Sequence, residues 1–385
     1  MTGRLHQPPR HRDSSRSIAN RRAIALRCAL RFVHAFLFVV AIAFAISLAS
    51  RASNVVAQEP EARAQEPEAS RTTTEIVVVV GAEGDPAYGK QFREWAGRWE
   101  TAARNSGAKI TFIGLERLAE GTGTLTDRDR LQQFLQAPLR RVAAEGGEQP
   151  ALWLVLIGHG TYDGKVARFN LRGPDVSAAE LNEWLTGVER PLAVINCSSS
   201  SGPFLNEMTG PNRVVITATK SGHEYNFARF GDFLSRAVID PAADLDKDEQ
   251  TSLLEAFLKA SADVREFYEG EARLTTEHAL LDDNGDRLGT PADWFRGVRA
   301  IKTAKSGAAP DGALATRFHL APSRAELALP EASRARRDEL ERELAALRKQ
   351  KSQLAEDDYL TKLEPLLVEL SRLYSEKGTG VNLAK

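Results

Sequence analysis

Cysteine is almost absent from this chain, which has only two among 385 residues, Cys28 and Cys197. Cys28 lies among arginines just before a long apolar run, and Cys197 is the single cysteine of everything that follows. That later part can form no internal disulfide, so if it is exported its fold must be stable through its apolar core alone. A lone cysteine in an oxidising compartment is open to oxidation unless it is buried or has a function.

Beyond the first segment, acidic residues outnumber basic ones. The whole chain has a net charge of −1, yet residues 1–57 hold nine arginines and a single acid, Asp13, a net of +8. The remainder therefore carries −9. Such a distribution leaves no basic surface for nucleic acid after the first segment, and we expect no nucleic-acid partner.

An apolar run of 18 residues, Phe32–Ala49, follows the basic segment. Its length lies between that of a signal-peptide core and that of a membrane span. We expect residues 1–31 to be a basic cytoplasmic lead, 32–50 a hydrophobic signal or anchor segment, and 51–73 an extended acidic linker. The membrane is thus a predicted partner. The domain that follows is expected outside the cytoplasm, either membrane-anchored or secreted after signal cleavage.

From residue 74 onward, short apolar runs alternate with helical patterns. Five runs bounded by glycine or polar residues predict buried strands, and they begin at residues 75, 109, 152, 192 and 213. Strands that alternate with helices indicate βαβ units, right-handed crossovers and a parallel sheet. The predicted fold class is therefore α/β, with helices on both faces of the sheet, in a domain that spans 74–300.

The third and fourth of these runs end in residues that can do chemistry, His159 and Cys197. In open α/β sheets, functional sites lie at the carboxyl ends of the parallel strands. If the two strands are neighbours, the imidazole and the thiol therefore meet at one edge of the sheet. A cysteine nucleophile needs a base for its proton and donors for the oxyanion, and the missing side chain of Gly160 lets a carbonyl approach its N–H. The Gly-x-Ser-x-Gly pattern of a serine hydrolase is absent, because Ser198 stands where the first glycine belongs.

This arrangement resembles the caspase–legumain-like cysteine peptidases over residues 75–297. The resemblance rests on an apolar strand that ends in Gly-His-Gly, a second that ends in cysteine, and their order and separation. It implies a caspase-like parallel-sheet sandwich in which Cys197 is the nucleophile and His159 the general acid and base. It also implies that the N–H groups of Gly160 and Cys197 form the oxyanion site. The implied activity is endopeptidase cleavage of a peptide or protein substrate through an acyl-enzyme, with no cofactor for catalysis.

The residues beside Cys197 depart from the pattern common in that family. Ile195 and Asn196 occupy the places where an acid or glutamine is commonly followed by alanine. An acid near the cysteine often selects a basic substrate side chain, so Asn196 and, in the loop after the next strand, Glu224 are candidate substrate-binding residues. His223 in that loop is an alternative base. The departures also leave open a catalytically inactive caspase-like scaffold at the cell envelope.

An acidic loop has the ligand spacing of an EF-hand. Asp244, Asp246 and Asp248 alternate, Ser252 fits the ninth position and Glu255 the twelfth. These oxygens predict a calcium site of structural or regulatory kind. The alternative is that the loop only caps the helix that follows it.

The C-terminal part is predicted to be helical. Residues 301–330 are rich in Ala, Pro, Gly and Ser and are expected to be a linker, 331–376 carry two leucine stripes, and 377–385 form a tail. Two helices with one apolar stripe each indicate a helical hairpin, or a short coiled coil with a protein partner.

Overall fold

The computed structural model describes residues 74–115, 125–137, 150–305 and 307–376. The predicted cytoplasmic lead, hydrophobic segment, acidic linker and tail lie outside these residues. Among the helices that are described, none is both long enough and apolar enough to cross a membrane.

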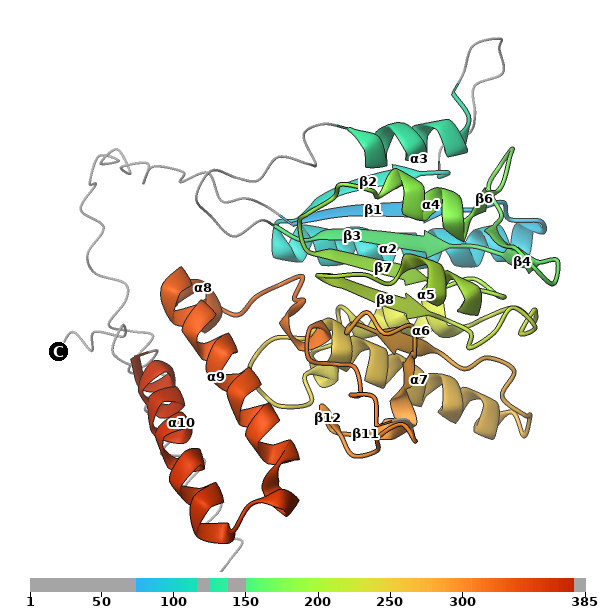
Figure 1. The fold of residues 1–385 in the computed structure, drawn as a ribbon. Helices are drawn as coiled ribbons and strands as arrows, with labels where there is room; N and C mark the ends of the chain where they lie inside the picture. The colour runs from blue at the N-terminus through green and yellow to red at the C-terminus, as the bar shows by residue number, and fades with distance from the viewer. Residues whose placement is uncertain (1–73, 116–124, 138–149, 306, 377–385) are drawn as a thin grey trace, which may run out of the picture. The chain divides into compact units, whose positions relative to one another are not determined.

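A seven-stranded sheet forms the centre of the α/β domain (Figure 1). In spatial order its strands are β10 (Thr290–Pro291), β9 (Leu280–Asp282), β8 (Arg213–Thr217), β7 (Leu192–Asn196), β3 (Leu152–Ile157), β1 (Glu75–Val80) and β2 (Lys109–Ile113). The five strands from β8 to β2 are parallel, which confirms the sheet expected from the sequence. The short strands β9 and β10, which add an antiparallel edge, were not expected.

Helices cover both faces of the sheet because alternate strand residues point to opposite sides. Ile76 and Val78 belong to a core with α2 (Pro86–Ser106), α6 (Phe230–Ala237) and α7 (Leu253–Gly270). Val77 and Val79 belong to a second core with α3 (Asp127–Gln136), α4 (Ala178–Trp184) and α5 (Gly202–Met208). Near-continuous apolar strands are thus explained by burial on both faces.

Shorter elements connect these layers. A three-stranded antiparallel sheet follows His159 directly, and a two-stranded sheet and several short helical turns come later in the chain. They are β4 (Gly160–Tyr162), β5 (Ala167–Phe169), β6 (Val176–Ser177), η2 (Pro241–Ala243), η3 (Ala292–Trp294), β11 (Phe295–Arg296), β12 (Arg299–Ala300), η4 (Ala315–Arg317) and α8 (Arg324–Ala328).

The stretch 301–330 is not a free linker, which corrects the expectation from its composition. Phe318 and Leu320 are buried in the first core, and the Leu253 N–H donates to the Phe318 carbonyl at 2.8 Å. The buried carboxylate of Asp283 accepts hydrogen bonds from the N–H groups of Gly312, Leu314 and Ala315. Small residues let this backbone run close to the domain, so the domain extends to about residue 320 instead of ending at 300.

The predicted helical hairpin is present. It consists of α9 (Glu331–Lys349), the turn η5 (Lys351–Gln353) and α10 (Glu356–Glu376). Leu340, Leu344 and Leu370 form its buried core. Arg336 holds Glu369 across the two helices through contacts of 2.7 and 3.0 Å. The partner of α9 is thus α10 of the same chain.

One close contact in the first core can be tested by substitution. A Cβ added at Gly231 would lie 2.7 Å from the Cβ of Cys197 and 2.8 Å from the Trp95 ring, so Gly231→Ala should destabilise the fold by about 1–3 kcal/mol. Gly97, within α2, has nothing within 4 Å of such a Cβ, and Gly97→Ala should be neutral or stabilise by up to about 1 kcal/mol. Urea unfolding measures both, and equal midpoints would contradict the packing described.

Candidate active site

The two reactive residues follow neighbouring strands. β3 and β7 pair in parallel with Leu156 opposite Asn196, and the Cys197 N–H donates to the Leu156 carbonyl at 2.9 Å. In chain order β3 and β7 are the third and fourth strands of the large sheet, as the sequence pattern predicted. This register brings the segments that carry His159 and Cys197 to the same edge of the sheet.

His159 lies among aromatic rings. Its ring centroid is 4.9 Å from that of Tyr88, 5.3 Å from Phe92 and 5.9 Å from Phe227. Its Nε2 is 3.3 Å from the carbonyl oxygen of Glu83. A carbonyl only accepts, so this contact favours a proton on Nε2 and leaves Nδ1 as the nitrogen that can take up a proton.

Cys197 lies on the same face of the sheet but inside the core. Its exposed fraction is 1%, its Cβ lies close to the backbone of Gly231, and it belongs to the same core as Trp95. Trp95 in turn contacts Phe92, which contacts the His159 ring. Burial, and secondly the charge of Glu277, raises the pKa of the Cys197 thiol to about 12. In this arrangement the sulfur is a protonated thiol at neutral pH.

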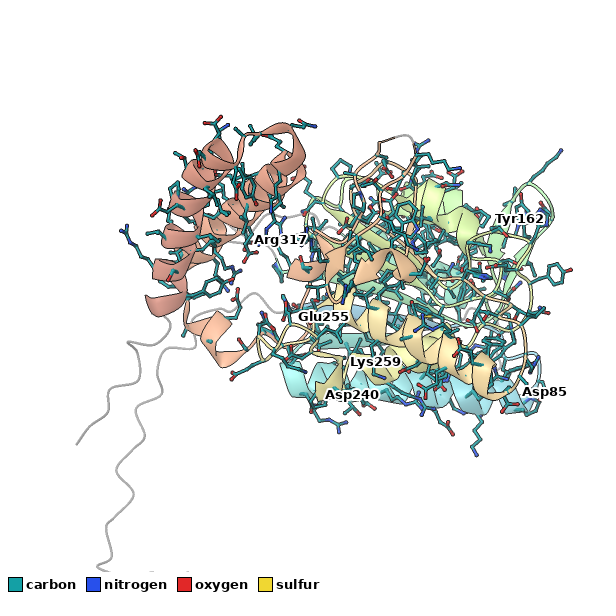
Figure 2. The ribbon with its side chains drawn as sticks, turned by 90° about the horizontal axis from the view of Figure 1, so that it is seen from below. Asp85, Tyr162, Asp240, Glu255, Lys259 and Arg317 are labelled. Atoms are coloured by element: carbon teal, nitrogen blue, oxygen red, sulfur yellow. The ribbon has the colours of Figure 1, made fainter. Side chains whose placement is uncertain are left out.

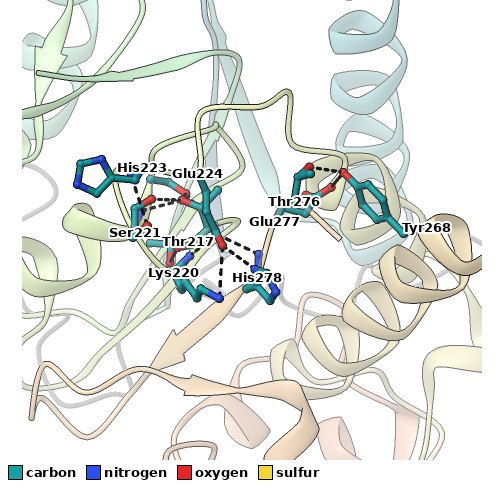
Figure 3. Close-up of polar contacts among 12 residues, drawn as sticks. Thr217, Lys220, Ser221, His223, Glu224, Tyr268, Thr276, Glu277 and His278 are labelled. Carbon is teal, nitrogen blue, oxygen red and sulfur yellow. Dashed lines mark hydrogen bonds and ion pairs between the residues drawn. The ribbon is translucent and has the colours of Figure 1, made fainter. Parts of the chain in front are cut away.

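The segment that covers Cys197 is fixed by Glu277. The carboxylate of Glu277 accepts hydrogen bonds from the N–H groups of Arg229 and Phe230 and from the Tyr268 hydroxyl at 3.1 Å. Figure 3 shows Glu277 and Thr276, on the segment that joins α7 to β9, beside Tyr268 of α7. Burial raises the pKa of Glu277, while the donated hydrogen bonds favour its charged form. Because α6 begins at Phe230, this carboxylate anchors the start of the helix over the thiol.

The two N–H groups expected at the oxyanion site differ in availability. The Cys197 N–H is used in the β3–β7 pairing. The Gly160 N–H contacts the Ser199 hydroxyl at a long 3.4 Å, and that hydroxyl donates to the Gly160 carbonyl at 3.2 Å. A Cβ at Gly160 would lie 2.2 Å from the Ser199 carbonyl oxygen, so only glycine fits here. The N–H of Gly160 is therefore the donor that a substrate carbonyl can compete for.

The candidate substrate-binding residues are engaged within the chain. Asn196 is fully buried, and its Oδ1 accepts hydrogen bonds from the N–H and the hydroxyl of Ser198 at 3.0 and 2.7 Å. Glu224 lies 2.6 Å from Nδ1 of His278 and 3.7 Å from Nζ of Lys220, contacts that Figure 3 shows together. Neither side chain faces open space in this arrangement.

His223, the alternative base, has its ring 5.4 Å from that of Tyr162.

Two residues that shape the site carry no signal in the sequence. Glu277 and Phe227 follow no motif and lie far from Cys197 in the chain, so only the fold reveals them. Their common effect is to close the site from the α6 side.

The acidic loop lies at the other end of the domain. Figure 2 shows Asp240 and Glu255 there, away from Tyr162 and Asp85. Ligand oxygens of Asp244, Asp246 and Glu255 lie within 4.8 Å of one another. Burial, and then the neighbouring carboxylates, raises the pKa of Asp246 to about 6, as expected where acids crowd together.

The same loop also caps α7, as the alternative predicted. The Ser252 hydroxyl accepts from the Glu255 N–H, and Glu255 accepts from the Ser252 N–H, which is a capping box. The other carboxylate oxygen of Glu255 accepts from the Leu245 N–H at 2.7 Å. Asp248 bonds to Gln250 and is not part of the cluster of three acids. Capping and calcium binding share residues, and calcium stays a prediction.

Comparisons with known families, curated proteins and solved structures assign no family to this chain. No family model and no curated protein matches the chain. One solved structure that it resembles is the crystal structure of the Drosophila initiator caspase Dronc, with a TM-score of 0.36 and 15% identity over 60% of this chain and 90% of that chain. A likeness this distant does not decide function. What the structure defines is an α/β domain with a mostly parallel sheet that brings a histidine and a cysteine to one edge.

The closed state of Cys197 predicts a low thiol reactivity. At pH 8 its alkylation by iodoacetamide should be about a thousandfold slower in the native protein than in urea, because burial raises the pKa of the thiol to about 12 and so lowers the thiolate fraction. Glu277→Gln should speed native labelling about tenfold, because it removes a charge that opposes the thiolate and loosens the start of α6. Peptide mapping by mass spectrometry separates Cys197 from Cys28.

Asp283→Asn is the matched control, because Asp283 is also a buried carboxylate that binds backbone N–H groups, but of a different segment. Its labelling rate should equal that of the unmodified protein. If Cys197 is alkylated at the same rate in native and in unfolded protein, the thiol is not buried as described.

The calcium prediction is tested by thermal unfolding. Calcium at about 1 mM should raise the Tm, because an ion bound only by the native loop stabilises it. Asp246→Asn should abolish the rise, whereas Asp286→Asn, an exposed acid outside the loop, should leave it intact. A Tm that does not respond to calcium would leave the loop with its capping role alone.

Proposed function

We propose that this chain is a cysteine endopeptidase of caspase–legumain type. The observation that carries the proposal is the pairing of β3 with β7, which places His159 and Cys197 at adjacent carboxyl strand ends and on one face of the sheet. The His159 ring contacts Phe92 of α2, and Cys197 lies in the same core, next to Gly231 of α6.

The chemistry follows from these groups. His159 takes the proton of Cys197, and the sulfur attacks the carbonyl carbon of the substrate peptide bond. The Gly160 N–H stabilises the oxyanion, the C–N bond breaks, and the imidazolium gives its proton to the leaving amine. Water then hydrolyses the thioester with His159 as base. This scheme uses no metal.

The thiol must leave the core before it can react. Gly231 and Phe227 cover the site, and Glu277 holds the segment between them, so the structure corresponds to a closed form of the proposed enzyme. A peptide or protein substrate bound along residues 219–229 displaces this cover. We place the activity outside the cytoplasm, in a chain either anchored through residues 32–50 or secreted after signal cleavage.

An activity-based label tests the proposal. The full-length protein is incubated with a library of peptide acyloxymethylketones that vary in the first recognised residue, and adducts are located by peptide mapping. We expect one adduct per chain on Cys197, lost in Cys197→Ala and reduced at least about a hundredfold in His159→Ala. The matched control His223→Ala should label normally. An adduct that survives His159→Ala would remove the histidine from its proposed role.

A second candidate function is an inactive scaffold with the same fold. The burial and the raised pKa of Cys197 favour it specifically, because a permanently closed thiol cannot attack a peptide bond. The scaffold hypothesis predicts that no library member forms an adduct with the folded protein. The same result is expected for the Glu277→Gln variant. The C-terminal helices then provide the surface that binds a protein partner.

A further inference from the structure

The outer face of α10 carries exposed apolar side chains. Leu360 is 50% exposed, Leu367 44% and Val368 43%, although the opposite face of the helix packs on α9. These residues line a groove of about 780 Å³ whose described lining comes from α10 alone. Large apolar side chains clustered on one exposed helix face mark an interaction surface.

The sequence along this face is self-complementary about Glu364. Leu360 and Thr361 lie four and three residues before it, and Leu367 and Val368 lie three and four residues after it. The flanking charges are opposite, since Asp357 lies seven residues before Glu364 and Arg372 eight residues after it. Among the described residues, neither Asp357 nor Arg372 makes an ion pair within the chain.

We propose that this face pairs two copies of the chain, with the two α10 helices antiparallel about a two-fold axis next to Glu364. Thr361 then lies against Val368 of the partner subunit, and Asp357 against Arg372 of the partner subunit. Both contacts occur twice, as an isologous interface requires. The apolar residues on either side of Glu364 supply the buried surface, and the two end pairs supply the charge complementarity.

Charge decides between the two helix directions. In a parallel pair Asp357 would face Asp357 and Arg372 would face Arg372, and like charges at flanking positions disfavour that arrangement. The antiparallel pair replaces both repulsions with ion pairs. One repulsion remains, because the two Glu364 carboxylates approach each other near the axis. This residue limits the affinity, and Glu364→Gln should tighten the dimer.

Site-specific cross-linking tests the geometry on the full-length protein in mild detergent, with Cys28→Ser as background. Chains that carry Thr361→Cys and chains that carry Val368→Cys, tagged to differ in size, are mixed under oxidising conditions. We expect the mixed disulfide to be the dominant covalent dimer, and neither variant to cross-link strongly by itself. A Thr361→Cys chain that cross-links readily alone would overturn the antiparallel arrangement.

Charge reversal tests the affinity independently. Asp357→Arg and Arg372→Asp should each weaken the dimer about tenfold in analytical ultracentrifugation, because attraction at both ends becomes repulsion. The double variant should regain most of the affinity, because each end again brings a positive charge at position 357 against a negative charge at position 372 of the other copy. Lys362→Glu, a charge change outside the groove, is the matched control. Protein that stays monomeric at about 50 µM, near the affinity expected of a small interface, would overturn the proposal.

Discussion

The pairing of β3 with β7 is the constraint on which the candidate site depends. The hydrogen bond from the Cys197 N–H to the Leu156 carbonyl fixes how far each strand extends, and the alternation of side chains then sends Cys197 to the α2 face. A slip of one residue would turn the thiol to the other side of the sheet. The packing of α2 and α6 is consistent with this register, because Tyr88 and Phe92 of α2 contact the imidazole and Gly231 of α6 lies against the Cys197 Cβ.

The same register also explains why the site is closed. A side chain directly after a buried strand enters the core unless the following helix leaves room, and here Gly231 lets α6 approach the Cys197 Cβ. Glu277 stabilises that approach from a separate segment by accepting the first N–H groups of the helix. The contacts that stabilise the start of α6 therefore also keep the Cys197 thiol unreactive. Any opening of the site must loosen the start of this helix.

The sequence predicts the parallel strands well because each is an apolar run of five or six residues between polar boundaries. It also predicts that His159 and Cys197 follow adjacent strands, since a parallel sheet collects strand ends at one edge. Burial of the thiol could not be predicted, because it depends on a glycine in a later helix and on the isolated acid Glu277. The role of 301–330 was missed because its core contacts come from a few scattered side chains, among them Phe318 and Leu320, and from backbone N–H groups, which composition does not reveal.

Chemical rescue tests whether His159 takes the proton of Cys197, as we propose. Rates of adduct formation by a peptide acyloxymethylketone are measured for His159→Ala with and without free imidazole in solution. We expect imidazole to restore part of the lost rate, because a small base can occupy the space among Tyr88, Phe92 and Phe227. If His159→Ala labels as fast as the unmodified protein without imidazole, or if imidazole does not restore the rate, His159 does not act on Cys197.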